Sequence, residues 1–259
     1  MEEIHSQLKN RYESSGFSQY TIRTDWQIIR RIGVHPALAT VKDLEAVVLR
    51  AKRQSTKGNY VARLRAIYKA LNKMDLVNGN NPAQDLPDVK VGRGSPKPVT
   101  KGEYARLLAE ATQPYKDWFI LGGRVGLRAH EVAKLQGADL IQTDSGYSLR
   151  VIGKGNTDLV VPIHAEVAEV IMSYNTLGSL WDINPNTFSK KAANEMRRIL
   201  GPDALHFHSL RHYFGTTAYE KSNGDLLVVR DLMRHSSVAT TQVYTKLDEG
   251  KTRDLINLL

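Results

Sequence analysis

Apolar residues recur at helical spacing through the first third of the chain, which predicts a helical domain. They lie three or four positions apart after Thr21 and again after Thr40-Val41-Lys42-Asp43. A longer stripe from Lys57 to Leu76 predicts a third helix, which Asn80-Asn81-Pro82 terminates. The three stripes consist of Ile22, Trp26, Ile29 and Ile32, then Leu44, Val47, Val48 and Ala51, then Tyr60, Leu64, Ile67, Tyr68, Leu71 and Met74.

The periodic pattern stops between Leu86 and Val99. This stretch contains five prolines and glycines among charged residues, a composition typical of a linker. We therefore predict two domains, residues 1–90 and 98–259, joined by a basic linker over residues 91–97.

Helical spacing returns after the linker. Thr100 and Glu103 form a capping-box pattern that opens a helix running through Ala111. Further helices are expected from about Pro114 to Gly122 and from Glu131 to Leu135.

The second half contains one segment with the period of a strand. Apolar and polar residues alternate from Tyr147 to Ile163 and are interrupted by Gly153-Lys154-Gly155, which predicts a β-hairpin. The remainder reads as helices, with loops around 184–186 and 201–205 and a short final helix at 252–259. The predicted fold class is mostly α with a small β-sheet, in two domains, one helical and one mixed α/β.

Composition narrows the class of protein. The 259 residues include no cysteine, which excludes disulfides, thiolate metal sites and cysteine nucleophiles. No apolar run approaches the length of a membrane span, and the polar N-terminus is no signal peptide. A cytoplasmic protein without membrane contact is therefore expected.

The net charge of +9 is concentrated in the first third of the chain. Residues 1–97 carry 17 Lys and Arg against 9 Asp and Glu, a net of +8, whereas residues 98–259 carry 19 against 18, a net of +1. This asymmetry favours a polyanion-binding module beside a nearly neutral one. A basic, solvated surface would give the same count.

Six residues of the second half form a set that suits one chemistry. An oxygen nucleophile that attacks a phosphodiester needs donors for the developing charge, a base, and an acid for the leaving oxygen. Arginine provides two parallel charge-assisted hydrogen bonds to phosphate, histidine can accept or donate a proton, and tyrosine can be the nucleophile. The set comprises Arg128, Lys154, His208, Arg211, His235 and Tyr244.

This set, in this order, resembles the tyrosine recombinases, the family of phage integrases and Xer-type recombinases. The strongest part is His208-x-x-Arg211, followed by His235 and then Tyr244 at the family's spacing. Three positions depart from the family pattern. Arg234 stands where glycine is usual, Ser209 replaces a frequent acidic residue, and Gly215 replaces a small aliphatic one.

The resemblance implies a role for each residue of the set. Arg128 and Arg211 would bracket the scissile phosphate, with His208 and His235 as further donors or proton acceptors. Lys154 would protonate the leaving 5′ oxygen, and Tyr244 would form a 3′-phosphotyrosyl link. Neither a metal nor another cofactor is required, because that link conserves the phosphodiester energy.

The resemblance also implies partners and domain roles. Residues 1–90 would be a core-site DNA-binding domain and residues 98–259 the catalytic domain, with an arm-binding N-terminal domain lacking. The partners would be double-stranded attachment sites, further copies of the chain in a tetramer on synapsed DNA (a monomer when free), and a directionality factor. The expected role is phage or mobile-element integration and excision in a bacterial cytoplasm. Candidate DNA contacts are Lys57, Arg63, Arg65, Lys69, Lys90, Arg93 and Lys97.

Other functions remain open from the residues. A type IB-like topoisomerase would use a related tyrosine site, and a catalytically silent DNA-binding regulator would use none. His208 and His212 have the spacing of a zinc-binding pair, but Ser-Leu-Arg lies between them with no glutamate, and Arg211 would repel a cation. No metal site is predicted.

Overall fold

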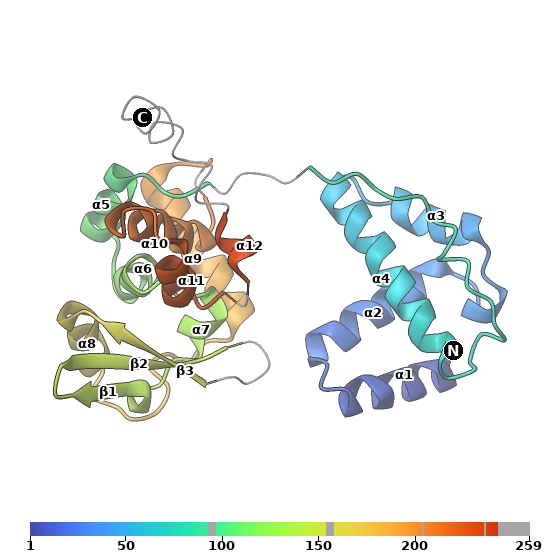
Figure 1. Ribbon diagram of the computed structural model, residues 1–259, viewed down its shortest axis with the longest axis horizontal. Coiled ribbons are helices and arrows are strands. Elements are labelled where there is room, and N and C mark those ends of the chain that lie inside the picture. The colour runs from blue at the N-terminus through green and yellow to red at the C-terminus, as the bar shows by residue number, and fades with distance from the viewer. Residues whose placement is uncertain (93–96, 154–157, 204, 236, 243–259) are drawn as a thin grey trace. The chain divides into compact units, whose positions relative to one another are not determined.

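A computed structural model describes residues 1–92, 97–153, 158–203, 205–235 and 237–242 (Figure 1). The chain divides into two compact units, residues 1–94 and 95–259, each with its own hydrophobic core. Within the described residues the protein is mostly helical with one small sheet, which confirms the predicted fold class. No described helix is both long enough and apolar enough to cross a membrane.

The first unit consists of helices around one apolar core (Figure 1). Its elements are α1 (Glu2–Ser14), α2 (Gln19–Ile32), η1 (Pro36–Leu38), α3 (Val41–Leu49) and α4 (Gln54–Asn72). Helix α1 was not predicted, although Ile4, Leu8 and Tyr12 follow one another every four residues and are all buried. The helix expected to open at Thr40 forms, and a capping box starts it, with the Thr40 hydroxyl accepting from the Asp43 main chain.

Two helix ends in this unit differ from the prediction. Helix α2 starts before Thr21, because the Ser18 hydroxyl accepts the Thr21 main-chain N–H and so caps the helix earlier. Helix α4 ends at Asn72 rather than near Leu76. The apolar stripe continues past this end, but Asp75 takes a left-handed φ of 54° and turns the chain.

The second unit combines helices with an antiparallel sheet. Its helices, in chain order, are α5 (Lys101–Glu110), α6 (Tyr115–Arg124), α7 (Ala129–Ala133), η2 (Gly137–Asp139), α8 (Ala165–Met172), α9 (Pro185–Leu200), α10 (His208–Lys221), α11 (Leu226–Met233) and α12 (Val238–Thr241). The Thr100 capping box forms as expected at the start of α5. A loop was expected around 184–186, but Asn184 caps α9 and Pro185 is its first residue.

The predicted hairpin is part of a larger sheet. Strand β2 (Gly146–Ile152) pairs antiparallel with β3 (Asp158–Ile163), with Tyr147 opposite Ile163. Strand β1 (Leu140–Thr143), which was not predicted, pairs with the other edge of β2 to give the order β1-β2-β3 among the described strands. Helix α8 packs against β2 (Figure 1).

Close packing of α6 on α10 places two parts of the chain beside each other. Gly122 of α6 permits this approach, because a Cβ at this position would lie 2.8 Å from the Phe207 ring and 3.2 Å from Leu210. The loop after α6 leads into Arg128, and the first turn of α10 carries His208 and Arg211. Helix packing thus brings segments about 80 residues apart to one place.

Candidate active site

Arg128 occupies the N-cap position of α7 and is held in place by Glu131. Its main-chain N–H donates to Oε2 of Glu131 at 2.7 Å, and its Nη1 donates to Oε1 at 2.7 Å. The Glu131 side chain is 1% exposed and that of Arg128 is 30% exposed. Burial alone would raise the pKa of Glu131, but the charge of Arg234 and the hydrogen bonds from Arg128 hold that pKa below its ordinary value. Glu131 is therefore an ionised support that sets the direction of Arg128.

Arg211 lies buried in the first turn of α10. Its Nη1 donates to the carbonyl oxygen of Gly126, and its Nη2 donates to that of Met233. Gly126 precedes Arg128 by two residues, and Met233 precedes His235 by two. One guanidinium therefore ties the segments that carry both of these residues to α10.

His208 and His212 lie one helical turn apart on α10, with ring centroids 4.6 Å apart and planes at 79°. Desolvation and the charges of Arg211 and Arg128 lower the pKa of His208. Desolvation, His208 and Arg211 lower the pKa of His212 to about 4. Both rings are therefore neutral at pH 7. Among the described residues, no group of three or more His, Asp or Glu is arranged to hold a metal ion.

His235 follows the end of α11. Its main-chain N–H donates to the carbonyl oxygen of Arg230 at 3.0 Å, and its Nδ1 lies 3.1 Å from Oγ1 of Thr241 in α12, a hydrogen-bond distance. Desolvation and the charge of Arg211, followed by those of Arg128 and Arg234, lower the pKa of His235 to about 4. The hydrogen bond to Thr241 fixes the ring and leaves Nε2 for a further contact.

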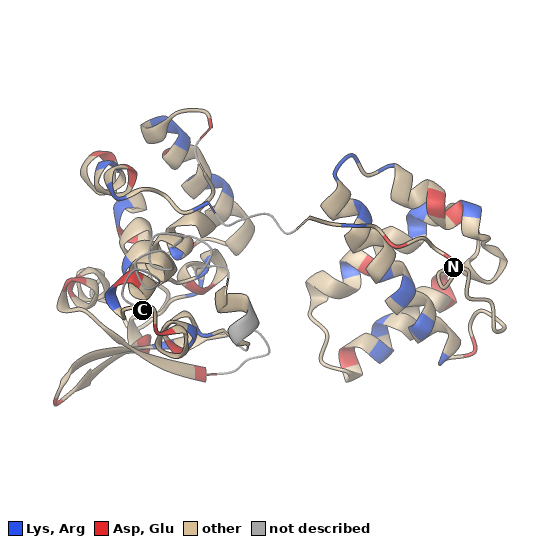
Figure 2. Ribbon diagram, turned by 45° about the horizontal axis from the view of Figure 1, so that its top comes forward, with Lys and Arg blue, Asp and Glu red and all other residues tan. Residues whose placement is uncertain are grey.

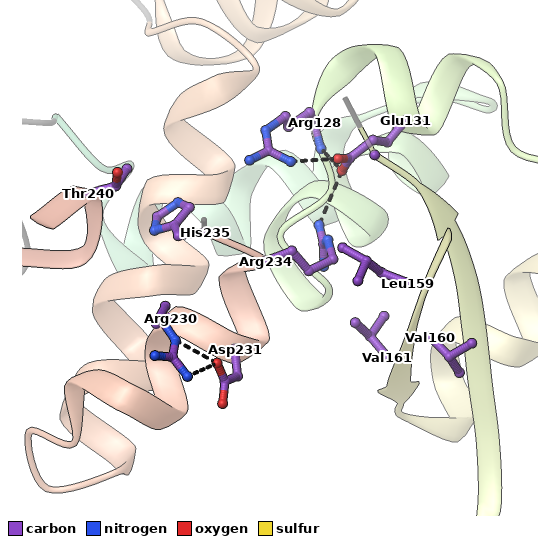
Figure 3. Close-up of a pocket in the computed structure, with 11 residues that line it drawn as sticks. Arg128, Glu131, Leu159, Val160, Val161, Arg230, Asp231, Arg234, His235 and Thr240 are labelled. Carbon is purple, nitrogen blue, oxygen red and sulfur yellow. Dashed lines mark hydrogen bonds and ion pairs between the residues drawn. The ribbon is translucent and has the colours of Figure 1, made fainter. Parts of the chain in front are cut away.

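Arg128 and His235 line the same cleft, which has a volume of about 590 Å³ (Figure 3). Figure 3 shows Glu131 between Arg128 and Arg234, joined to both by dashed lines. Strand β3 forms an apolar wall of the cleft with Leu159, Val160 and Val161. The cleft thus combines cationic groups with a neutral imidazole, a combination that suits an anionic substrate.

Some of the predicted site residues lie outside the described residues. These are Lys154, Tyr244 and Arg93, together with the expected final helix at 252–259. Gly153, the last described residue before Lys154, lines the cleft. The described residues therefore bring together Arg128, His208, Arg211 and His235 of the six predicted catalytic residues.

Two of the predicted DNA contacts have partners inside the first unit. Arg63 pairs with the buried Asp25 at 2.5 Å, and its side chain is 25% exposed. Arg65 donates to Asp88 at 2.7 Å and to the carbonyl oxygen of Leu86 at 2.7 Å. These contacts give both arginines a role in the structure of the unit that the sequence did not reveal.

The other predicted DNA contacts among the described residues are more open to solvent. Lys69, Lys90 and Lys97 are exposed, and Lys57 is half-buried. Figure 2 shows Lys and Arg recurring along the helices of the unit that contains residues 1–94. In this unit a groove of about 340 Å³ between α1, α2 and α4 is lined by Arg11, Lys69 and Lys73 among others. Arg11 was missed because α1 was missed.

Comparison with known proteins places the chain among recombinases. A sequence model described as "Phage integrase family" matches residues 98–251. The tyrosine recombinase XerC of Pseudomonas fluorescens is 31% identical over 250 residues, which cover 86% of this chain and 81% of that protein. A tyrosine recombinase of Pseudothermotoga lettingae is 26% identical over 234 residues, which cover 83% of this chain and 81% of that protein.

Solved structures share the fold. The lambda integrase (residues 75–356) dimer bound to a COC′ core site aligns with a TM-score of 0.70 at 14% identity, covering 93% of this chain and 96% of that one. The XerH site-specific recombinase in a post-cleavage complex with palindromic difH aligns with a TM-score of 0.63 at 17% identity, covering 83% and 70%.

Proposed function

Because the chain belongs to the phage integrase family of tyrosine recombinases, we propose that it is a site-specific DNA recombinase. Tyr244 attacks a DNA phosphate and forms a 3′-phosphotyrosyl link, releasing a 5′ hydroxyl. The 5′ hydroxyl of a partner strand then attacks that link, restoring the phosphodiester and freeing the tyrosine. The observation that carries the proposal is the cleft that Arg128 and His235 share. Arg211 ties the segments that carry both residues together, and the charges of Arg211 and Arg128 act on His208.

The two arginines stabilise the charge that develops on the phosphate. Arg128 uses one guanidinium nitrogen for Glu131 and retains N–H groups for the non-bridging oxygens. Arg211 is buried and holds two carbonyl oxygens. Its positive charge adds to that of Arg128 beside the phosphate.

The histidines act in their neutral forms. A free tyrosine is protonated at pH 7, so its attack needs a proton acceptor. Neutral His208 can accept that proton, and a bound phosphate would then offset the arginine charges that lower the pKa of His208. With its Nδ1 accepting from the Thr241 hydroxyl, His235 carries its proton on Nε2 and donates it to a non-bridging oxygen as a hydrogen bond. Lys154, next to Gly153 of the cleft, protonates the leaving 5′ oxygen.

The basic first third of the chain, residues 1–97, supplies much of the affinity for double-stranded DNA. Phosphate contacts from Lys57, Lys69, Lys90, Arg93 and Lys97 would set register, and base contacts would set specificity. Related structures include a lambda integrase dimer on a core site and a lambda integrase tetramer on a Holliday junction. We extend this assembly to the present chain as a tetramer on two paired sites. The role is integration and excision of a phage or mobile element in a bacterial cytoplasm, with a directionality factor as a further partner.

The test is a covalent-adduct assay on candidate attachment-site DNA with a nick close to the cleavage point. A 3′-phosphotyrosyl link keeps the 5′-end-labelled strand on the protein, so a 5′ label should shift on a denaturing gel and a 3′ label should not. Tyr244→Phe should abolish the adduct while DNA binding persists, whereas the matched change Tyr213→Phe should retain it. An adduct formed by Tyr244→Phe would overturn the assignment. Relaxation of supercoiled plasmid without recombination of paired sites would identify a topoisomerase instead.

A further inference from the structure

Arg234 ends helix α11 in a conformation that usually calls for glycine. Its φ of 53° and ψ of 46° lie in the left-handed region, where an L side chain is strained. An arginine is therefore an unusual residue at this helix end. Its side chain must make contacts that offset the strain.

The guanidinium of Arg234 is 2% exposed and reaches three elements of the site. It donates to the carbonyl oxygens of Leu232 at 3.2 Å, Val125 at 3.4 Å and Gly126 at 3.1 Å, and to Oε2 of Glu131 at 3.1 Å. Its Nε is buried without a partner among the described residues. A cation this deeply buried would be costly unless its contacts served the surrounding structure.

Each of two acceptors of Arg234 is shared with a proposed catalytic arginine. Oε2 of Glu131 also accepts the Arg128 main-chain N–H, while Oε1 holds the Arg128 guanidinium. The carbonyl oxygen of Gly126 also accepts from Arg211. Arg234 is directly followed by His235 in the chain. Arg234 is thus joined to His235 by a peptide bond, and it shares one hydrogen-bond acceptor with Arg128 and another with Arg211.

We propose that Arg234 is a positioning residue that holds Arg128, through Glu131, and Arg211, through the Gly126 carbonyl, in register with His235. This inference rests on the proposed function. Arg234 lines the cleft, but its side chain is 2% exposed, so it is assigned no direct contact with DNA. Its effect on strand cleavage is transmitted by the shared carboxylate and the shared carbonyl.

The contrasting explanation is that Arg234 only stabilises the end of α11. A stabilising role would change melting temperature but not the cleavage rate of the folded protein. A positioning role would change the cleavage rate with little effect on DNA affinity. It would also make the effect of Arg234 depend on Glu131, because the two act on Arg128 as one unit.

The experiment compares Arg234→Gly, Arg234→Lys, Glu131→Gln and the double variant Arg234→Gly with Glu131→Gln. Glycine accepts the left-handed backbone without strain, and lysine retains the charge but not the planar fork. The control is Arg198→Ala, which removes an arginine from a pair with Glu195 elsewhere in the same unit. Single-turnover cleavage of nicked site DNA, equilibrium binding of a single site and thermal melting are measured for each.

Arg234→Gly should cleave about 10- to 100-fold more slowly, because small misplacements of catalytic groups have effects of this size. Binding should stay within about threefold, since a group that acts in the transition state contributes little to ground-state affinity. Arg234→Lys should recover part of the rate, and Arg198→Ala should cleave like the unaltered protein. In the Arg234→Gly background, Glu131→Gln should cost less than it does alone.

Three results would overturn the inference. The first is an unaltered cleavage rate in a folded Arg234→Gly variant, and the second is fully additive losses in the double variant. The third is failure of both Arg234 variants to fold, which would assign the residue to stability alone. If the unaltered protein formed no adduct, the proposed function would fail first and the inference with it.

Discussion

Arg211 of α10 donates a hydrogen bond to the carbonyl oxygen of Gly126, 85 residues earlier in the chain. This contact places the helix that carries His208 against the loop that leads into Arg128. Because a second Arg211 nitrogen binds the carbonyl oxygen of Met233, the segment before His235 is fixed to the same side chain. The candidate site is therefore built around a buried cation, and its geometry depends on a small number of long-range hydrogen bonds.

Removal of the Glu131 carboxylate should destabilise the second unit. Glu131→Ala would leave Arg234 buried without its ionic partner, and breaking a buried pair in this way costs about 3–5 kcal/mol. For a unit of this size the loss corresponds to a fall in melting temperature on the order of 10 °C. Differential scanning calorimetry measures it, with the exposed Glu169→Ala as control. Equal melting of the two variants would show that Glu131 is not a structural support.

Stability should fall on acidification from neutral pH because of the two histidines near the site. In the folded protein the pKa of His212 and that of His235 are lowered from the ordinary 6.5 to about 4. Between pH 4 and 6.5 the unfolded chain therefore binds more protons than the folded chain. Stability is therefore fully present above the unfolded pKa of about 6.5 and is lost as pH falls towards about 4.

The measurement is the free energy of unfolding by urea between pH 4.5 and 6.5. His212→Gln should reduce the dependence of this free energy on pH, because it removes the uptake of up to one proton on unfolding. The reduction is at most about 1.4 kcal/mol per pH unit and is less where the ring is partly solvated. The exposed His164→Gln serves as control. An unchanged slope in His212→Gln would mean that His212 titrates alike in the folded and unfolded chains.

The sequence predicted the fold class because periodicity and capping are local signals. The helix start expected at Thr40 and the capping box expected at Thr100 both form, and the segment from 147 to 163 contains a paired hairpin. Strand β1 gave no such signal. It has only four residues, and buried and exposed positions do not alternate along it. Its strand conformation depends on pairing with β2.

The candidate site was less predictable, since the hydrogen bonds that hold its residues in place join segments far apart in the sequence. Arginine is rarely fully buried, so nothing local indicates that Arg211 and Arg234 lie in the interior. Their partners lie as far as 109 residues away along the chain. The departure from glycine at position 234 was visible in the sequence, but its meaning required the left-handed backbone and the neighbouring Glu131.

The first unit should supply most of the salt-sensitive DNA affinity. Residues 98–259 expressed alone should bind a site weakly. The full chain should lose affinity steeply with salt, by a log–log slope of about −0.9 per phosphate neutralised. Fluorescence anisotropy at several salt concentrations measures both. Equal affinity of the fragment and the full chain would contradict the proposed division of roles.

Individual lysines of the groove between α1, α2 and α4 can be tested in the same assay. Lys69→Ala and Lys73→Ala should each weaken binding for all DNA sequences and reduce the salt slope by about one. Lys9→Ala, which removes an exposed α1 lysine paired with Glu13, is the control. Arg63→Ala should instead lower stability, because it leaves the buried Asp25 unpaired. A groove variant with unchanged slope would place the DNA on another face of the unit.

Lys154 can be tested as the general acid with a substrate whose leaving group needs no proton. Lys154→Ala should slow strand cleavage while binding stays nearly unchanged, because protonation of the leaving oxygen matters only in the transition state. A substrate with sulfur in place of the 5′ bridging oxygen has a leaving group that needs no proton, so it should restore cleavage in this variant. The same substrate should not rescue Arg128→Ala, since Arg128 is assigned to the non-bridging oxygens. Rescue of both variants, or of neither, would remove Lys154 from the role of acid and leave the leaving oxygen to another donor.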